Sequence, residues 1–532
     1  MSNPAYISGM RIRWANIGVQ IDGANGGFVT DCHFEQSQTG VYSANCGAQG
    51  IVVDGTVCDV QTPYGSTGGC ISGTLLDVCP GSTDPHVSAN FAGLGQAEGG
   101  AGDDGGAVGP NYFVAVQNQQ VAVYDKITGQ RLTPPTSLGQ FLTVVVPDGP
   151  FAGTHQATAD PRVLYDPRSQ RWIACGLAQE YNSPWNVVLG VSLGSDPVGN
   201  GGDNWVADNW TNYLVPFNLT AIDQPRLGVD DNGIYIAVSN PTYIAAIPKA
   251  GYLDHTAPPV VDAQLYITAN TSVNAVVPAQ NFDAAGSKDP EWLLADTSLN
   301  GTISVAAITW SGSPPLPTVG AWVPLQISGT SGVTGGHAAP QLGWPYGIKL
   351  GDEAFHLGRP LARHIQGDQF LWTCHGIYVN AAGNDNDGQA DRAAVEWFVI
   401  ETSSAPMQMV GTRIWDSAAA DPMFYYFPSI AVNTHGDVVV GYGGSSSSSY
   451  ISAYYSAYGG TSGLVGAPTK LFGGTDYLYG GGDYNFRWVD YSNTSVDPDG
   501  LTIWTVQPYA ETRVSDSVWN EYATRVAQIV PY

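Results

Sequence analysis

Short apolar segments alternate with turn residues along most of the chain. Beyond Pro110 these segments are rich in Val, Ile, Leu, Tyr and Trp, and no helical period separates them. The pattern predicts many short β-strands and an all-β fold. The predicted strands cover residues 112–124, 163–165, 172–177, 187–191, 234–238, 265–268, 303–310, 370–379, 395–400, 430–442, 451–455, 501–506 and 523–529.

The length of this region selects among the all-β architectures. Residues 111–532 exceed an ordinary β-sandwich, whereas about six to eight four-stranded blades account for them. We therefore predict a β-propeller of about seven blades over residues 111–532.

The front of the chain carries a repeat. Four segments, 7–12, 29–34, 53–58 and 71–76, can be overlaid, and their first residues lie 22, 24 and 18 positions apart. A period near twenty with short apolar strands is typical of a parallel β-helix, whose coils stack side chains into ladders. We predict such a segment over residues 1–90. An irregular Gly-rich leader with accidental matches is the alternative.

Between these two regions lies a stretch with almost no large apolar residue. Residues 91–110 are mostly Ala, Gly, Gln, Glu and Asp, a composition that predicts a Gly-rich linker. The expected division is therefore a β-helix segment at 1–90, a linker at 91–110 and a propeller at 111–532.

The cysteines add a constraint on the front segment. There are seven, and five of them, at positions 32, 46, 58, 70 and 79, fall in the first eighty residues. Their spacing fits no zinc motif, so disulfides and buried thiols both remain open, and an odd number leaves at least one unpaired. We expect the five to lie inside or at the corners of the coils.

The net charge of the chain excludes some classes of binding partner. The chain has 46 acidic and 19 basic residues and a formal charge of −27. This field repels phosphate backbones, so nucleic acid is excluded as an expected partner, and it favours cations such as Ca²⁺. No apolar run is long enough for a membrane span.

Localisation follows from what the first residues lack. Residues 1–6 show no basic region followed by an apolar core. We expect an extracellular or cell-surface protein whose leader was removed, or alternatively a virion surface component released by lysis.

Four motifs stand in order along the large region. They are Ala107-Val108-Gly109-Pro110-Asn111-Tyr112-Phe113, Asp160-Pro161-Arg162-Val163-Leu164-Tyr165-Asp166, Pro225-Arg226-Leu227-Gly228-Val229 and Arg487-Trp488-Val489-Asp490-Tyr491-Ser492. In this order they resemble a group of large uncharacterised bacterial secreted β-propeller proteins with sialidase-like, Asp-box type blades. The resemblance covers residue 107 to the C-terminus, and Val489 departs from it by replacing the usual Gly. It implies about seven blades and a secreted or surface setting, and no activity.

The front repeat, at residues 7–12, 29–34, 53–58 and 71–76, resembles a short pectate-lyase-like parallel β-helix.

One of the resembling motifs is a loosened Asp box at residues 495–504, with one residue too many before Gly500. In propellers this box is a turn, in which the Asp ties its own loop and the Trp packs between strands. It therefore indicates a blade and not a catalytic site.

Sialidases, the propeller enzymes nearest in motif, need clustered arginines, an activated tyrosine and a carboxylic acid. The candidate catalytic cluster is Asp223, Arg226, Arg487, Asp490 and Tyr491, because resembling chains also place polar residues there. The alternative is that these side chains hold loops together at blade corners, since fold does not imply function.

The candidate metal site is an acidic loop at residues 384–391. Asp385, Asp387 and Asp391 offer oxygen ligands at alternating positions around a Gly turn, which suits Ca²⁺. An ordinary acidic hairpin loop is the alternative.

Two functions remain open at this stage. The first is a non-catalytic extracellular surface or structural protein, with a propeller head for glycan or partner contact. In this case residues 1–90 mediate assembly into a homo-oligomer, a filament or a virion appendage. The alternative is a secreted glycan-degrading enzyme, either a sialidase-like hydrolase or a polysaccharide lyase. A pocket in which Arg, Tyr and Asp converge would favour the enzyme.

Overall fold

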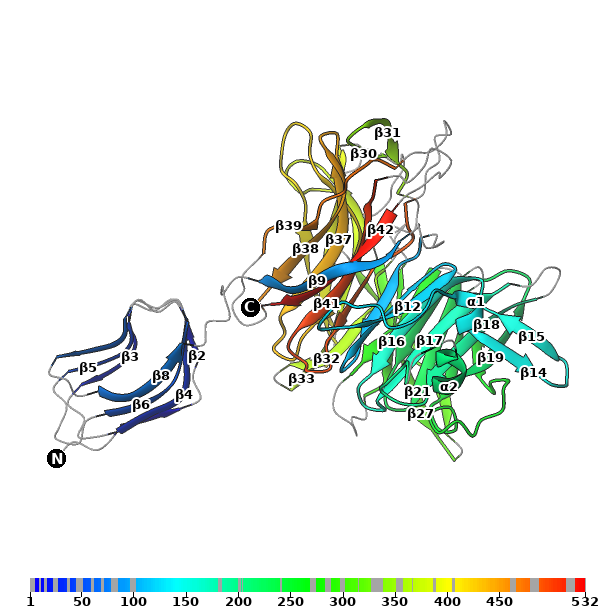
Figure 1. Ribbon diagram of the computed structural model, residues 1–532, viewed down its shortest axis with the longest axis horizontal. Coiled ribbons are helices and arrows are strands. Elements are labelled where there is room, and N and C mark those ends of the chain that lie inside the picture. Colours follow the sequence, from blue (N-terminus) through cyan, green and yellow to red (C-terminus); the bar gives the residue numbers. More distant parts are fainter. Residues whose placement is uncertain are drawn as a thin grey trace. The chain divides into compact units, whose positions relative to one another are not determined.

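The computed structural model divides the chain into two compact units, Met1–His86 together with Tyr532, and Val87–Pro531 (Figure 1). Between residues 5 and 77 it describes the backbone of eight strands. The other described residues are 85–95, 102–179, 184–199, 202, 204–239, 242–267, 274–282, 289–296, 302–313, 315–326, 338–350, 357–365, 367–385, 389–403, 407–459, 466–478, 488–512 and 522–531.

The first unit contains two sheets whose strands all pair in parallel. One has the order β1-β4-β6-β8, with β2 also paired to β4, and the other has the order β3-β5-β7. The strands are β1 (Ala5–Ser8), β2 (Arg11–Arg13), β3 (Ile17–Asp22), β4 (Gly27–Glu35), β5 (Thr39–Ala44), β6 (Ile51–Cys58), β7 (Thr62–Thr67) and β8 (Ile71–Asp77).

The strand register can be compared with the repeat. Ile7 pairs with Val29, and Val29 pairs with Val53, as the overlay of the first three segments predicts. The fourth segment is shifted by two residues, because Val53 pairs with Gly73 and not with residue 71. This shift lengthens the last repeat toward the length of the others. The parallel β-helix itself stays a prediction.

The second unit is all-β with a β-propeller arrangement, and five of its sheets are separate blades of four or five strands. Strands that follow one another in the chain pair antiparallel within each blade. The blades are β10 (Gly105–Val108), β11 (Tyr112–Gln117), β12 (Gln120–Asp125) and β13 (Thr136–Ser137); β16 (Ala159–Asp166), β17 (Arg171–Ala178), β18 (Trp185–Ser192) and β19 (Trp210–Leu219); β24 (Asn274–Pro278), β26 (Glu291–Asp296), β27 (Thr302–Ser311), β28 (Leu316–Val319) and β29 (Val323–Gln326); β36 (Phe424–Val432), β37 (Val438–Ser446), β38 (Ser449–Tyr458) and β39 (Thr469–Phe472); and β40 (Asn493–Val496), β41 (Ile503–Ala510), β42 (Tyr522–Val530) and β9 (His86–Gly95).

A nine-stranded sheet occupies the remainder of the ring. Its central strand, β25, pairs in parallel with β20 on one side and β32 on the other. The sheet order is β23 (Gln264–Ile267), β22 (Tyr243–Pro248), β21 (Gly233–Ser239), β20 (Asp223–Val229), β25 (Gln280–Asn281), β32 (Leu361–Ile365), β33 (Asp368–Val379), β34 (Arg392–Glu401) and β35 (Gln408–Ile414).

Smaller elements decorate these sheets. They are the hairpins β14 (Thr143–Val146) with β15 (Gly153–Gln156) and β30 (Ala339–Gln341) with β31 (Trp344–Ile348), and the short helices α1 (Leu138–Phe141) and α2 (Trp205–Asn209). No helix in the described ranges is long and apolar enough to cross a membrane.

The first strands of successive sheets form the inner ring. Strand β10 contacts β16, β16 contacts β20, β20 contacts β24, β36 contacts β40, and β40 returns to β10. The last blade joins two distant parts of the chain, because β9 is the outer neighbour of β42 (Figure 1). N-terminal and C-terminal strands therefore share a blade, which removes two exposed sheet edges.

This closure corrects the prediction of a linker at 91–110. Half of β9 and all of β10 lie in that range, and the compact units divide between His86 and Val87. The small residues are there for close packing. A Cβ at Gly105 would lie 2.8 Å from Val116, and one at Gly106 would lie 2.7 Å from the Phe113 ring.

The loosened Asp box is a structural turn, as expected. The Asp497 carboxylate accepts hydrogen bonds from the Trp504 indole and from Lys126 Nζ, each 2.9 Å long. Lys126 follows β12, so this contact joins the last blade to the first. Asp497 is only 3% exposed, and Gly500 closes the turn with a φ of 75°.

Candidate functional site

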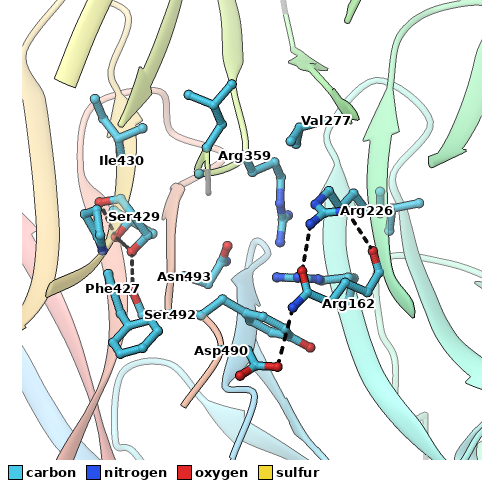
Figure 2. A pocket seen from close by; sticks show the side chains of 17 residues that line it. Arg162, Arg226, Val277, Arg359, Phe427, Ser429, Ile430, Asp490, Ser492 and Asn493 are labelled. Carbon is cyan, nitrogen blue, oxygen red and sulfur yellow. Dashed lines mark hydrogen bonds between the residues drawn. The ribbon is translucent and has the colours of Figure 1, made fainter. Parts of the chain in front are cut away.

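A pocket of about 60 Å³ opens among the inner strands (Figure 2). Its charged lining comes from β16, β20 and the segments just before β32 and β40. The charged and phenolic residues are Arg162, Arg226, Arg359, Asp490 and Tyr491. The others are Gln224, Leu227, Val277, Leu357, Gly358, Phe427, Pro428, Ser429, Ile430, Ser492, Asn493 and Thr494.

A repeated backbone feature aims side chains into this pocket. In β16, β20 and β36 the strand register slips, and at each slip a residue in the left-handed region precedes a proline. Residues before proline normally adopt extended conformations, and β-bulges often redirect a side chain beside a functional site. The three left-handed residues are Asp160 (φ 52°), Gln224 (φ 45°) and Phe427 (φ 51°). Two positions after each of them stand the pocket residues Arg162, Arg226 and Ser429.

Arg162 is held against an aromatic ring. Its guanidinium carbon lies 3.1 Å from the centroid of the Tyr491 ring, and its Nε donates to the Pro225 carbonyl at 3.1 Å. The Tyr491 hydroxyl donates to the Pro161 carbonyl at 3.1 Å. Burial raises the pKa of Tyr491 well above its usual range, so this phenol is neutral.

Arg226 is 5% exposed and has neutral hydrogen-bond partners. Its Nη1 donates to Ser239 Oγ at 2.6 Å and to the Gln224 carbonyl at 3.4 Å, and its Nη2 donates to Gln224 Oε1 at 2.7 Å. Burial, followed by the charge of Arg162, lowers the pKa of Arg226 to about 10. No salt bridge joins either arginine to a carboxylate within the described part of the chain.

Arg359 completes the basic wall. Its Nη1 donates to the Val163 carbonyl at 3.3 Å, and burial, followed by the charge of Arg162, lowers its pKa to about 9. Figure 2 shows the side chains of Arg162, Arg226 and Arg359 pointing toward one another. In this buried space the charge of Arg162 disfavours the charged forms of Arg226 and Arg359, and a bound anion would offset this repulsion.

Carboxyl groups gather beside the basic wall. The Gln224 N–H donates to Asp160 Oδ2 at 2.9 Å and to Asp223 Oδ1 at 3.1 Å, while the Asp490 N–H donates to Asp103 Oδ1 at 3.0 Å. Burial raises the pKa of Asp160 to about 6. Burial, and then the neighbouring charge of Asp490, raises the pKa of Asp103 well above its usual range.

The opposite wall consists of hydroxyl groups. Ser492 Oγ donates to the Phe427 carbonyl and to Ser429 Oγ, each at 2.9 Å, and Ser429 Oγ lies 2.7 Å from Thr494 Oγ1. Gln507 Nε2 also donates to Ser429 at 3.1 Å. The pocket thus has one wall of arginines, with the carboxyl group of Asp490 beside it, and one neutral polar wall.

The sequence identified part of this cluster. Arg226, Asp490 and Tyr491 line the pocket, and Asp223 lies beside it against the Gln224 backbone, whereas Arg487 lies outside the described residues. A catalytic role for them stays a prediction. The sequence reasoning missed Arg162 and Arg359.

The sequence contains a pattern that could have predicted one of these two arginines, Arg162. Asp160-Pro161-Arg162 matches Gln224-Pro225-Arg226 in its last two residues, so a comparison between blades would have selected Arg162. Gly358-Arg359-Pro360 has no such counterpart.

At the predicted calcium loop, the described carboxylates face arginines. Asp385 Oδ2 lies 3.5 Å from Arg413 Nη2, and Asp391 Oδ1 accepts from Arg392 Nε at 2.8 Å. Asp387 lies outside the described residues. Among the residues that the structure describes, no three His, Cys, Asp or Glu side chains are grouped to hold a metal. The calcium site stays a prediction.

The thiols can be placed only in part. Cys175 and Cys374 are buried and unpaired by disulfide, and burial raises the pKa of Cys175 to about 12. The five cysteines of the first eighty residues lie outside the described side chains.

No protein-family model matches the chain, and no curated protein sequence matches it. Solved structures are similar in arrangement at low identity. The N-terminal domain of Nup159 is 10% identical with a TM-score of 0.35, over 84% of this chain and 95% of that one. A Trypanosoma rangeli sialidase in complex with the inhibitor DANA is 9% identical with a TM-score of 0.32, over 73% of this chain and 58% of that one. The α-L-arabinofuranosidase PaAbf62A from Podospora anserina in complex with cellotriose is 10% identical with a TM-score of 0.28, over 58% of this chain and 91% of that one. No activity is inferred from these likenesses.

Proposed function

We propose that the propeller pocket recognises the carboxylate group of an acidic glycan. The observation that carries this proposal is the convergence of Arg162, Arg226 and Arg359 on one pocket, where the first two have no carboxylate partner among the described residues. Guanidinium groups bind carboxylates through paired, charge-assisted hydrogen bonds. The net charge of the chain is −27, so its overall field repels anions. A pocket lined by arginines is therefore the place where an anion is expected to bind.

The pocket has room for an acid group. The centres of water-sized groups can occupy about 60 Å³ of it, several times the roughly 10–15 Å³ that one buried water needs on the same measure. A carboxylate therefore fits among the arginines. The hydroxyl wall of Ser429, Ser492 and Thr494 offers donors and acceptors to the polar atoms next to the acid group.

Calorimetric titration tests this proposal with a pair of ligands that differ only in the acid group. Methyl glucuronide is expected to bind with a dissociation constant of about 1 mM or tighter, and methyl glucoside is not. Arg226→Met should remove the binding. Arg525→Met is the matched control, because Arg525 in β42 stacks on Phe472 in β39 of the neighbouring blade and is not part of the pocket lining. Equal affinity for both sugars would rule out carboxylate recognition.

Glycan hydrolysis at the same pocket is the second candidate, and it is favoured by the meeting of arginines, Tyr491 and Asp490 in one lining. Tyr491 is a neutral phenol whose hydroxyl is directed to Pro161, so it is not prepared as a nucleophile. Asp490 would then act as the general acid or base. Release of the aryl group from aryl glucuronides, and its loss in Asp490→Asn, would establish the enzyme.

The blade number and the role of the first unit belong to the same proposal. We propose that the nine-stranded sheet comprises two blades bridged by β25, which gives seven blades in all. The first unit is proposed to be a short parallel β-helix that mediates assembly, since all its strand pairs are parallel. Such an arrangement suits an extracellular, cell-surface or virion-surface setting.

Light scattering tests the assembly. The intact chain should form an oligomer, and a variant without residues 1–85 should be monomeric. An intact chain that stays monomeric at high concentration would exclude this role for residues 1–85.

A further inference from the structure

The side chain of Gln224 stands between opposite charges. Its Oε1 accepts from Arg226 Nη2 at 2.7 Å, and its Nε2 donates over a long 3.5 Å to Asp490 Oδ2. The two ends of one neutral amide thus face a guanidinium group and a carboxylate. Within the described part of the chain no salt bridge joins Arg226 to Asp490, and both residues line the pocket.

The backbone fixes this position. Gln224 is 6% exposed, has a φ of 45° and precedes Pro225 at the register slip of β20. Its N–H donates to both Asp160 and Asp223. Because the bulge and these hydrogen bonds hold the main chain, the direction of the side chain is set by the fold and not by the ligand.

An amide at position 224 leaves the charge of Arg226 uncompensated, whereas a carboxylate at this position would neutralise it. Arg226 donates only to neutral oxygens, those of Gln224 and Ser239, so its positive charge is not compensated by them. A Glu in place of Gln224 would form an ion pair with Arg226 and repel Asp490. The neutral side chain orients the guanidinium group and leaves its charge available to a ligand.

We infer that Gln224 is a specificity-determining positioning residue, which presents Arg226 to an anionic ligand and prevents its neutralisation by Asp490. This inference rests on the proposed recognition of a carboxylate. It adds that the selectivity of the pocket for anions depends on an uncharged residue at position 224.

Two variants and one control test the inference by titration with methyl glucuronide. Gln224→Glu should weaken binding at pH 7 by about tenfold or more, because it neutralises Arg226. The loss should shrink as the pH falls and the introduced carboxyl group takes up a proton. Gln224→Met keeps the size but not the hydrogen bonds, so its smaller loss should not depend on pH in this way. Gln528→Glu makes the same charge change on β42, away from the pocket lining, and should bind as the wild type does.

Each result has a definite meaning. Thermal unfolding first checks that the variants fold, and Gln224→Met provides the comparison if Gln224→Glu does not. If the wild type binds methyl glucuronide and Gln224→Glu binds equally well, the role of Gln224 is refuted while carboxylate recognition stands. Equal, pH-independent losses in both variants would show a merely structural role. A wild type that does not bind the ligand refutes both proposals.

Discussion

The guanidinium carbon of Arg162 lies 3.1 Å from the centroid of the Tyr491 ring, while the hydroxyl of that ring is hydrogen-bonded to the Pro161 carbonyl. The face of the Tyr491 ring therefore packs against Arg162 in the pocket, whereas the hydroxyl group makes a hydrogen bond to the backbone. Stacking on an aromatic ring orients an arginine without neutralising it.

Substitution of Tyr491 separates these two roles. Tyr491→Phe keeps the ring and should change the affinity for methyl glucuronide by less than about threefold, with a loss of about 1 kcal/mol in unfolding free energy. Tyr491→Leu removes the platform for Arg162 and should weaken binding by about tenfold. If Tyr491→Phe abolished hydrolysis of an aryl glucuronide, the phenol would be a nucleophile and this account of Tyr491 would be wrong.

The affinity for an anion should depend on pH through Asp160, which lies with Asp103, Asp223 and Asp490 beside the basic wall. Burial raises the pKa of Asp160 to about 6, so this group loses its negative charge as the pH falls from 7.5 to 5.5. Repulsion of a bound carboxylate then decreases, and affinity should rise by roughly threefold to tenfold. Titrations across this range should show the rise in the wild type and a weaker pH dependence in Asp160→Asn.

Glu291 provides a pH-dependent prediction for stability. Its side chain is 0% exposed, and burial, followed by the charge of Asp230, raises its pKa well above its usual range. The nearby cations already have partners, Lys249 with Asp166 at 2.7 Å and Arg168 with Asp231 at 3.0 Å. The folded state therefore keeps Glu291 neutral, whereas the unfolded chain ionises it above about pH 4.3.

The sign of the effect follows from this difference. The contribution of Glu291 to stability is complete below the unfolded pKa and is lost as the pH rises toward the folded pKa. Glu291→Gln cannot ionise, so relative to wild type it should gain about 1 kcal/mol or more between pH 4 and pH 7. Urea unfolding at the two pH values measures the gain. A difference that does not change with pH would mean that Glu291 is ionised in the folded protein.

The turn at Asp497 should be among the costly positions for stability. Asp497→Ala leaves Lys126 and the Trp504 indole without their acceptor and should destabilise the propeller by about 3 kcal/mol. Asp497→Asn keeps an acceptor for the indole and should cost less. The exposed Asp148 is the control, and Asp148→Asn should stay within about 0.5 kcal/mol in the same denaturant titrations. Equal costs for Asp148→Asn and Asp497→Ala would show that the turn does not join the blades.

The strands and their register were predictable where side chains repeat at regular spacing. Ile7, Val29 and Val53 pair as the overlay predicts, because stacked coils place equivalent apolar residues next to one another. Gly105 and Gly106 misled the prediction of a linker, because the same small residues serve flexible segments and tightly packed strands. Composition alone does not distinguish these two uses.

The site was only partly predictable because it is made by closure of the ring. Arg162, Arg226 and Arg359 are far apart in the sequence, and each points inward because of its position in an inner strand or just before one. The bulges at Asp160 and Gln224 depend on pairing with the following strands, so no local pattern reveals them. Arg226, Asp490 and Tyr491 were predicted only because they lie in sequence motifs that resemble those of other propellers.

The most direct test of carboxylate recognition is a crystal structure of the protein soaked with methyl glucuronide. The account predicts sugar density at the pocket, with carboxylate oxygens about 3 Å from guanidinium nitrogens of Arg162, Arg226 and Arg359. Density for the ligand only elsewhere on the propeller, or a bound sugar whose carboxylate faces away from these arginines, would contradict it.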